Sequence, residues 1–94
     1  MVALLSVSSL LMSIRDVFAA NLRKLRLERG LSQEELGHQA NMHRTYVSSL
    51  ERCEYSVSID ALADLATALG VKPSELLRFD DPVEPEAAKD HNHV

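Results

Sequence analysis

Hydrogen-bonding side chains between residues 43 and 49 offer the clearest chemistry in this sequence. The stretch 32–51 reads as two short helices joined by a tight turn, and its apolar residues account for one buried face: Leu36, Ala40, Met42, Val47 and Leu50. The side chains left for the outer face of the second helix are His43, Arg44, Thr45, Ser48 and Ser49. These groups are donors and acceptors rather than apolar surface. They therefore predict recognition of another molecule by hydrogen bonding.

Candidate catalytic or metal-binding residues are scattered. His38 and His43 lie five positions apart, which is not a usual ligand spacing on a helix, and His91 and His93 would hold a metal only weakly. The sequence contains no cysteine–histidine cluster, phosphate-binding loop or nucleophile elbow. We therefore expect a protein that is not an enzyme and needs no cofactor or metal.

The elements that must position the polar face are helices. Capping boxes at Ser13 and Ser32 open two of them. Gly30 ends the first helix, which we expect over about residues 13–29. Asn41 supplies the turn before the helix that carries the polar face, because Asn tolerates the left-handed conformation.

The second half of the sequence continues the helical pattern. The polar-faced helix is expected over about 43–52. Ser58 caps a further helix that Gly70 stops, and Pro73 opens a short final helix near 73–78. No segment alternates convincingly as a strand. The predicted fold class is all-α, a compact domain of five helices.

Charge is distributed unevenly along the chain. The formal net charge of −4 arises in residues 80–94, which hold five acidic residues against Lys89. Residues 1–79 balance at nine against nine, and residues 23–52 carry an excess of +2. A basic face can therefore coexist with an acidic isoelectric point. The single cysteine, Cys53, excludes an intrachain disulfide and fits a reducing compartment.

Three regions are expected along the chain. Residues 1–12 form an N-terminal extension, residues 13–79 a helical domain, and residues 80–94 an acidic, proline-punctuated tail that we expect to be disordered. The apolar start is too short to span a bilayer, and no Lys or Arg precedes it as in a signal peptide. We therefore expect a cytoplasmic protein without membrane association. Initiation at Met12 would make residues 1–11 an upstream extension.

The stretch NLRKLRLERGLSQEELGHQANMHRTYVSSLE resembles the lambda-repressor-like helix-turn-helix family, the Cro/repressor or xenobiotic-response-element type of DNA-binding regulator. The similarity covers about residues 14–78. It rests on L-R-x-x-R-x-x-x-G-L-S-Q-E-E-L arriving together with the second-helix pattern. Within the family, H-R-T-Y-V-S-x-x-E-R is most similar to the controller proteins of restriction–modification systems. The resemblance implies a transcription regulator, such as a repressor, that binds double-stranded DNA.

The resemblance also implies that the second helix of the motif enters the major groove with its N-terminal residues against base edges. Arg44 is the best candidate for base reading, because its planar fork matches guanine O6 and N7. Thr45 could bond a base and contact a thymine methyl group. Ser48 and Ser49 are assigned to base edges or phosphates without a choice between them. The alternative for Arg44 is a solvated surface arginine.

Four further residues are expected to contact the DNA backbone, which fixes register without reading sequence. Gln33 resembles the family glutamine that clamps phosphate and buttresses the reading side chain. His43, Tyr46 and Arg52 complete this set. For Tyr46 the alternative is packing on the edge of the core, and for Arg52 it is an ordinary cation at a helix end.

Two residues match a structural feature of the family. Arg26 and Glu51 correspond to its ion pair between the first helix and the recognition helix. Gly37 replaces a commoner Ala, and Cys53 stands where Gly or Asn is usual, so mild backbone strain is expected there. Tyr55 occupies a position that is often basic, which puts one phosphate contact in doubt.

One recognition helix covers only a few base pairs, so we expect a homodimer on a roughly palindromic operator. Its two recognition helices would lie about 34–36 Å apart. The dimer surface is predicted from apolar residues that find little core nearby: Val71, Leu76, Leu77 and Phe79. The alternative places these residues in the core of one chain.

Two other functions remain open. An antitoxin-type regulator of a toxin–antitoxin pair would also bind a protein partner, and the acidic tail could be the binding segment. A protein-only interaction module would have lost DNA binding. If the chain activates transcription, Glu34 is placed to meet RNA polymerase.

Overall fold

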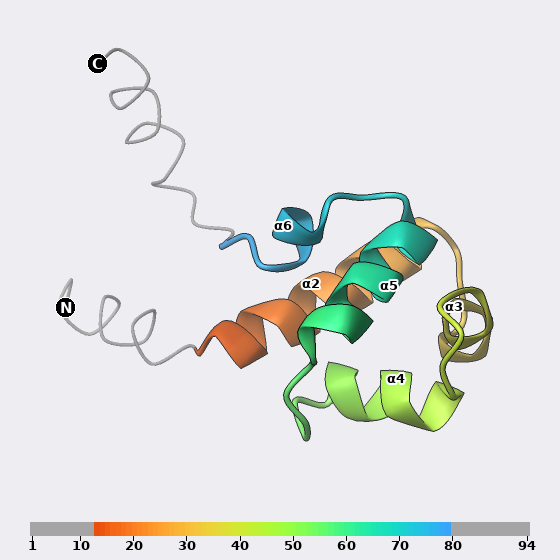
Figure 1. Cartoon of the computed structure of the whole chain (residues 1–94), viewed down its shortest axis with the longest axis horizontal. Coiled ribbons are helices and arrows are strands. Elements are labelled where there is room, and N and C mark those ends of the chain that lie inside the picture. The colour runs from red at the N-terminus through yellow and green to blue at the C-terminus, as the bar shows by residue number, and fades with distance from the viewer. Residues whose placement is uncertain (1–12, 80–94) are drawn as a thin grey trace, which may run out of the picture.

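The computed structural model of the chain describes residues 13–79, and all regular elements within that range are helices. In chain order they are α2 (Ile14–Glu28), α3 (Gln33–Gln39), α4 (Arg44–Glu51), α5 (Ile59–Leu69) and α6 (Pro73–Leu76) (Figure 1). The predicted all-α class with five helices is confirmed. The N-terminal extension and the acidic tail lie outside the described residues.

Local sequence explains where the first two helices begin. Ser32 Oγ accepts a hydrogen bond from the Glu35 N–H at 2.9 Å, and Glu35 Oε1 accepts one from the Ser32 N–H at 2.8 Å. Ser13 and Asp16 form the same reciprocal pair at the start of α2. Each box satisfies backbone donors that a helix start otherwise leaves unpaired. The predicted capping boxes are therefore both present.

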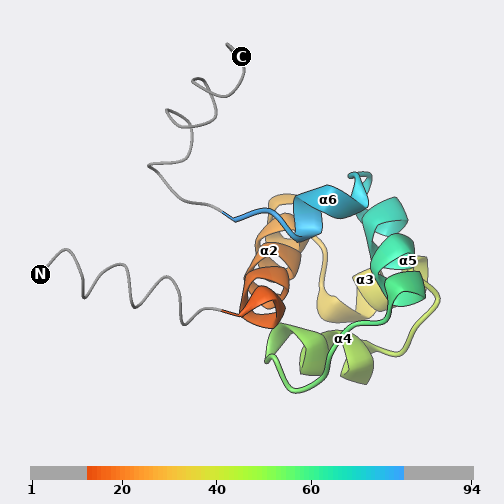
Figure 2. The same cartoon turned by 60° about the vertical axis from the view of Figure 1, so that its left-hand side comes forward.

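The helices of residues 13–79 enclose an apolar core. Helix α4 packs against α2 and α3, while α6 packs against α2 and α5. In both views α4 and α6 lie at opposite edges of the domain (Figures 1 and 2). The largest fully buried side chains come from every described helix: Phe18, Leu22, Leu36, Val47, Leu50, Leu65 and Leu76.

The predicted exposure of Leu76 is wrong, because its side chain is fully buried within the chain. Two hydrogen bonds hold its segment against α2: Asn21 Nδ2 donates to the carbonyl oxygens of Leu76, at 3.0 Å, and of Arg78, at 2.8 Å. Val71 and Leu77 are partly buried against the core. Phe79 is 53% exposed. The alternative, core of one chain, therefore holds for Leu76.

None of the helices in residues 13–79 has both the length and the hydropathy to cross a membrane.

Candidate nucleic-acid interface

The turn between α3 and α4 sets the angle between these two helices. Asn41 adopts the left-handed conformation predicted for it, with φ of 60°. The Met42 N–H donates to the Gly37 carbonyl at 2.8 Å. A Cβ on Gly37 would lie 2.6 Å from the Met42 carbonyl oxygen, so the backbone would have to shift to accept it. The close approach of the α3 backbone to the turn at Met42 therefore depends on Gly37. The family's commoner Ala would require this turn to change its backbone geometry.

The N-terminal end of α4 presents three polar side chains to solvent. His43 is the N-cap residue, and its Nδ1 accepts a hydrogen bond from the Thr45 N–H at 3.0 Å. In a neutral ring this bond leaves Nε2 as the donor. Arg44 and Thr45 are exposed, and the Arg44 guanidinium forms no hydrogen bond or ion pair with another residue between 13 and 79. Donors are therefore available where a ligand could approach.

The predicted exposure of Ser49 is wrong: this side chain is only 6% exposed. Its position on α4 turns it inward, near Glu54, whose pKa its hydroxyl slightly lowers. Ser48 is half-buried. Tyr46 is partly buried and packs against the core, which was the alternative to a DNA contact for this residue.

Arg52, at the C-terminal end of α4, forms hydrogen bonds with two neighbouring side chains. Its Nε donates to Glu54 Oε2 at 2.8 Å and its Nη2 to Glu54 Oε1 at 3.1 Å, while Nη1 donates to Ser48 Oγ. Both members of the ion pair are about half exposed. The sequence gives no signal that Glu54 pairs with Arg52, because residues two apart in a helix do not face each other. Contact becomes possible only because the chain leaves the helical conformation between them.

The C-terminal end of α4 forms a Schellman motif. The Cys53 N–H donates to the Leu50 carbonyl and the Glu54 N–H to the Ser49 carbonyl, at 3.1 and 2.9 Å. Cys53 occupies the left-handed position with φ of 63°, where strain was expected. Its Sγ donates to Asp16 Oδ1 at 3.0 Å, and this bond raises the pKa of the thiol. Cys53 is thus a protonated structural link between α4 and the start of α2.

The expected contact between Arg26 and Glu51 is present and buried. Arg26 Nε donates to Glu51 Oε2 at 2.6 Å and Nη2 to Glu51 Oε1 at 3.0 Å. Arg26 Nη1 also donates to the Leu31 carbonyl at 2.8 Å. Gln33 Nε2 donates to Glu51 Oε1 at 3.0 Å. This network joins α2, α3 and α4, and it holds the Gln33 side chain beside the reading helix.

Within the described range, no group of three or more His, Cys, Asp or Glu side chains is arranged to hold a metal ion. His91 and His93 lie outside that range.

Two short helices at a tight turn, with a buried ion pair beneath and a polar outer face, define a helix-turn-helix domain. A helix-turn-helix family model matches residues 22–76, more than half of the chain. The chain therefore belongs to the lambda-repressor-like helix-turn-helix family of DNA-binding transcription regulators. This membership confirms that it is a regulator and not an enzyme.

Several relatives are control proteins. The control protein C.BamHI of Bacillus amyloliquefaciens is 41% identical over 68 residues, which cover 71% of this chain and 84% of that protein. The crystal structure of the restriction–modification controller protein C.AhdI from Aeromonas hydrophila has a TM-score of 0.65 at 42% identity, covering 66% of this chain and 94% of that chain. The hypothetical transcription factor NHTF from Neisseria has a TM-score of 0.71 at 38% identity, covering 81% and 85%. The resemblance to controller proteins is confirmed.

Proposed function

We propose that the chain is a sequence-specific regulator that binds a roughly palindromic operator as a homodimer and controls a restriction–modification system. The observation that carries DNA reading is the exposed N-terminal end of α4, where His43, Arg44 and Thr45 present free hydrogen-bonding groups. The similarity to control proteins from different bacteria supports the regulatory context.

Arg44 and Thr45 read bases in this proposal. An exposed arginine without an intramolecular partner can place both arms of its guanidinium on guanine O6 and N7. The His43 Nε2–H and the second N–H of the Gln33 amide remain available for phosphate oxygens, because the first N–H of that amide bonds Glu51. Tyr46 and Ser48 lie beside this surface and contribute less, since each is partly covered.

Arg44→Ala tests base reading. Selection of bound genomic fragments first defines the operator, and fluorescence anisotropy then measures affinity for it and for single-base variants. The substitution should cost about 1–3 kcal/mol on the operator and relax the preference at one base position. An equal loss on every DNA sequence would mean that Arg44 contacts phosphate instead.

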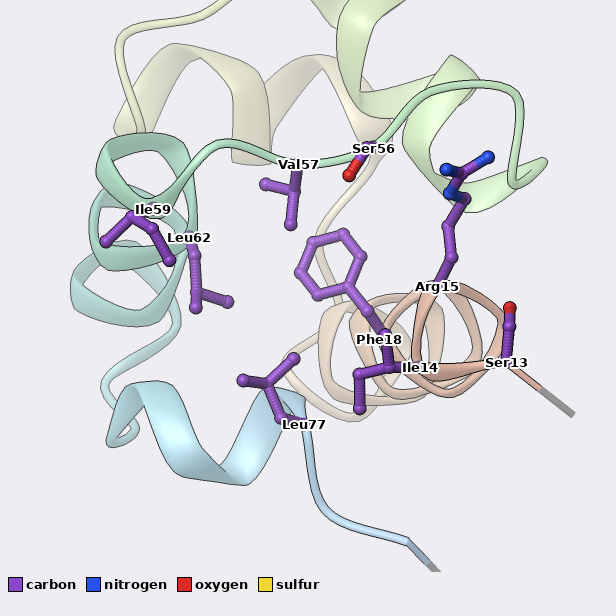
Figure 3. Close-up of a pocket in the computed structure, with 9 residues that line it drawn as sticks. All are labelled: Ser13, Ile14, Arg15, Phe18, Ser56, Val57, Ile59, Leu62 and Leu77. Carbon is purple, nitrogen blue, oxygen red and sulfur yellow. The ribbon is translucent and has the colours of Figure 1, made fainter. Parts of the chain in front are cut away.

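The dimer surface in this proposal centres on an apolar groove of about 490 Å³ between α2, the start of α5 and the segment after α6. Figure 3 shows the Phe18 ring facing the space bounded by Val57, Leu62 and Leu77. Ile59 at the groove is 79% exposed. Ile59 and Ile14, which is 52% exposed, leave apolar surface at the rim of the groove, and this surface suits a second copy of the chain. Of the residues predicted for this surface, Leu77 lines the groove.

Ile59→Asp tests the dimer. Ile59 is the first residue of α5, where an acidic side chain is tolerated, so the variant should fold. Leu27→Asp is the control, because Leu27 is an exposed apolar residue, at 54%, that does not line the groove. Analytical ultracentrifugation should show a monomer only for Ile59→Asp. A dimer that survives this change would exclude the groove, and a wild-type monomer would exclude the homodimer.

The genomic setting tests the controller function. A neighbouring nuclease–methyltransferase pair would support it. Co-purification with a small basic protein would instead favour an antitoxin-type regulator.

A further inference from the structure

The ion pair between Arg52 and Glu54 lies at the end of the DNA-reading helix, and its geometry is that of a phosphate contact. The two N–H···O bonds from Arg52 to the carboxylate, at 2.8 and 3.1 Å, form a bidentate fork. Arginine offers the same fork to a phosphate group. The carboxylate therefore occupies the donors that a DNA backbone would otherwise use.

The backbone of Glu54 is held in this place by the fold. Its N–H is fixed to the Ser49 carbonyl by the Schellman motif. The hydrogen bonds and the charge of Arg52 lower the pKa of Glu54, and the nearby Ser49 hydroxyl lowers it slightly further. The carboxylate is therefore charged and lies beside Arg52 in the free protein.

We propose that Glu54 acts as an intramolecular competitor for the phosphate that Arg52 would bind, and thereby limits the affinity of the protein for DNA. This inference rests on the proposed function, because it assumes that α4 enters the groove.

An exposed ion pair is weak, so a phosphate can compete with it, but Glu54 also repels the phosphate by its own charge. In the wild-type complex Arg52 therefore remains with Glu54 and neutralises little phosphate charge. Removing the carboxylate charge leaves Arg52 bonded only to the neutral Ser48 hydroxyl, so its guanidinium can add one phosphate contact in each subunit.

The experiment measures operator affinity of the full chain between roughly 50 and 200 mM salt by fluorescence anisotropy. Glu54→Gln keeps the shape of the side chain and removes its charge. The plot of log affinity against log salt should become steeper by about 0.9 per subunit, and affinity at the lowest salt should rise. Arg52→Ala should leave the wild-type slope nearly unchanged but abolish the gain in the Glu54→Gln background.

Glu75→Gln is the matched control. It removes an equal charge from a second exposed arginine pair, Glu75 with Arg78, on and beside α6 at the edge opposite α4 (Figure 2). This variant should keep the wild-type slope. A wild-type slope in Glu54→Gln, or a gain that survives Arg52→Ala, would overturn the proposal. A wild-type protein that binds no DNA would instead overturn the proposed function.

Discussion

Replacing Glu51 with alanine should destabilise the domain more than any exposed charge change. The Arg26 and Glu51 side chains are only 10% and 4% exposed, and two short hydrogen bonds join them. After the substitution, the Arg26 charge stays buried with only the Leu31 carbonyl as a partner. Gln33 also loses its acceptor. Removing one member of a buried ion pair costs about 3–5 kcal/mol, because the remaining charge is poorly compensated.

Such a loss is large for a small domain, whose total stability is about 5–15 kcal/mol. Urea unfolding followed by circular dichroism measures it, and a lower midpoint with an unchanged m-value identifies a loss of stability. Glu75→Ala breaks an exposed pair at 3.6 Å and should cost about 0–1 kcal/mol. Replacing both partners, Arg26→Met with Glu51→Leu, should recover most of the loss.

A change of under about 1 kcal/mol for Glu51→Ala would refute this reasoning. It would mean that water or a neighbouring group compensates Arg26. A double variant as unstable as Glu51→Ala would show that the network matters through its shape rather than through its charge.

Three further predictions concern the backbone and the helix ends. Asn41→Val should lower the free energy of unfolding by about 1–2 kcal/mol, since a β-branched residue resists the left-handed conformation; urea unfolding checks this. Gly37→Ala gains about 1 kcal/mol in helix propensity but meets the Met42 carbonyl, so it should destabilise overall by about 1 kcal/mol and weaken operator binding, measured by unfolding and anisotropy. Hydrogen bonds from Cys53 and Ser13 lower the pKa of Asp16 below its ordinary value of 3.8, and hydrogen bonds from Ser32 lower the pKa of Glu35 below 4.5. The stability that the two capping boxes contribute is therefore complete above the ordinary pKa values, and it is lost as the pH falls through the lowered pKa values. Acid unfolding of the double variant Asp16→Asn with Glu35→Gln should depend less on pH than that of the wild type.

Features that depend on neighbouring residues could be predicted from the sequence. Both capping boxes use side chains three residues apart, so their geometry follows once a helix forms. Asn41 and Gly70 mark left-handed positions for the same local reason. The periodic apolar residues indicated which helix faces turn inward, and helix boundaries followed within two residues.

Ser49 and Leu76 show where residue type misleads. A serine on a recognition helix suggests an exposed group, but the packing of α4 against α2 and α3 turns Ser49 inward. An apolar residue near the end of the helical domain suggests an interface. The contacts of α6 with α2 and α5 instead place Leu76 in the core.

The sequence by itself therefore determined the helices, their caps, the family and the polar end of α4, because each depends on short-range spacing. Only the tertiary structure decided which polar groups stay free for DNA. Arg44 remains unpaired within residues 13–79, while Arg52 is held by Glu54. The physical reason is that pairing at the end of α4 depends on a positive φ at Cys53, and that residue is held by Asp16 from a helix 37 positions earlier in the chain.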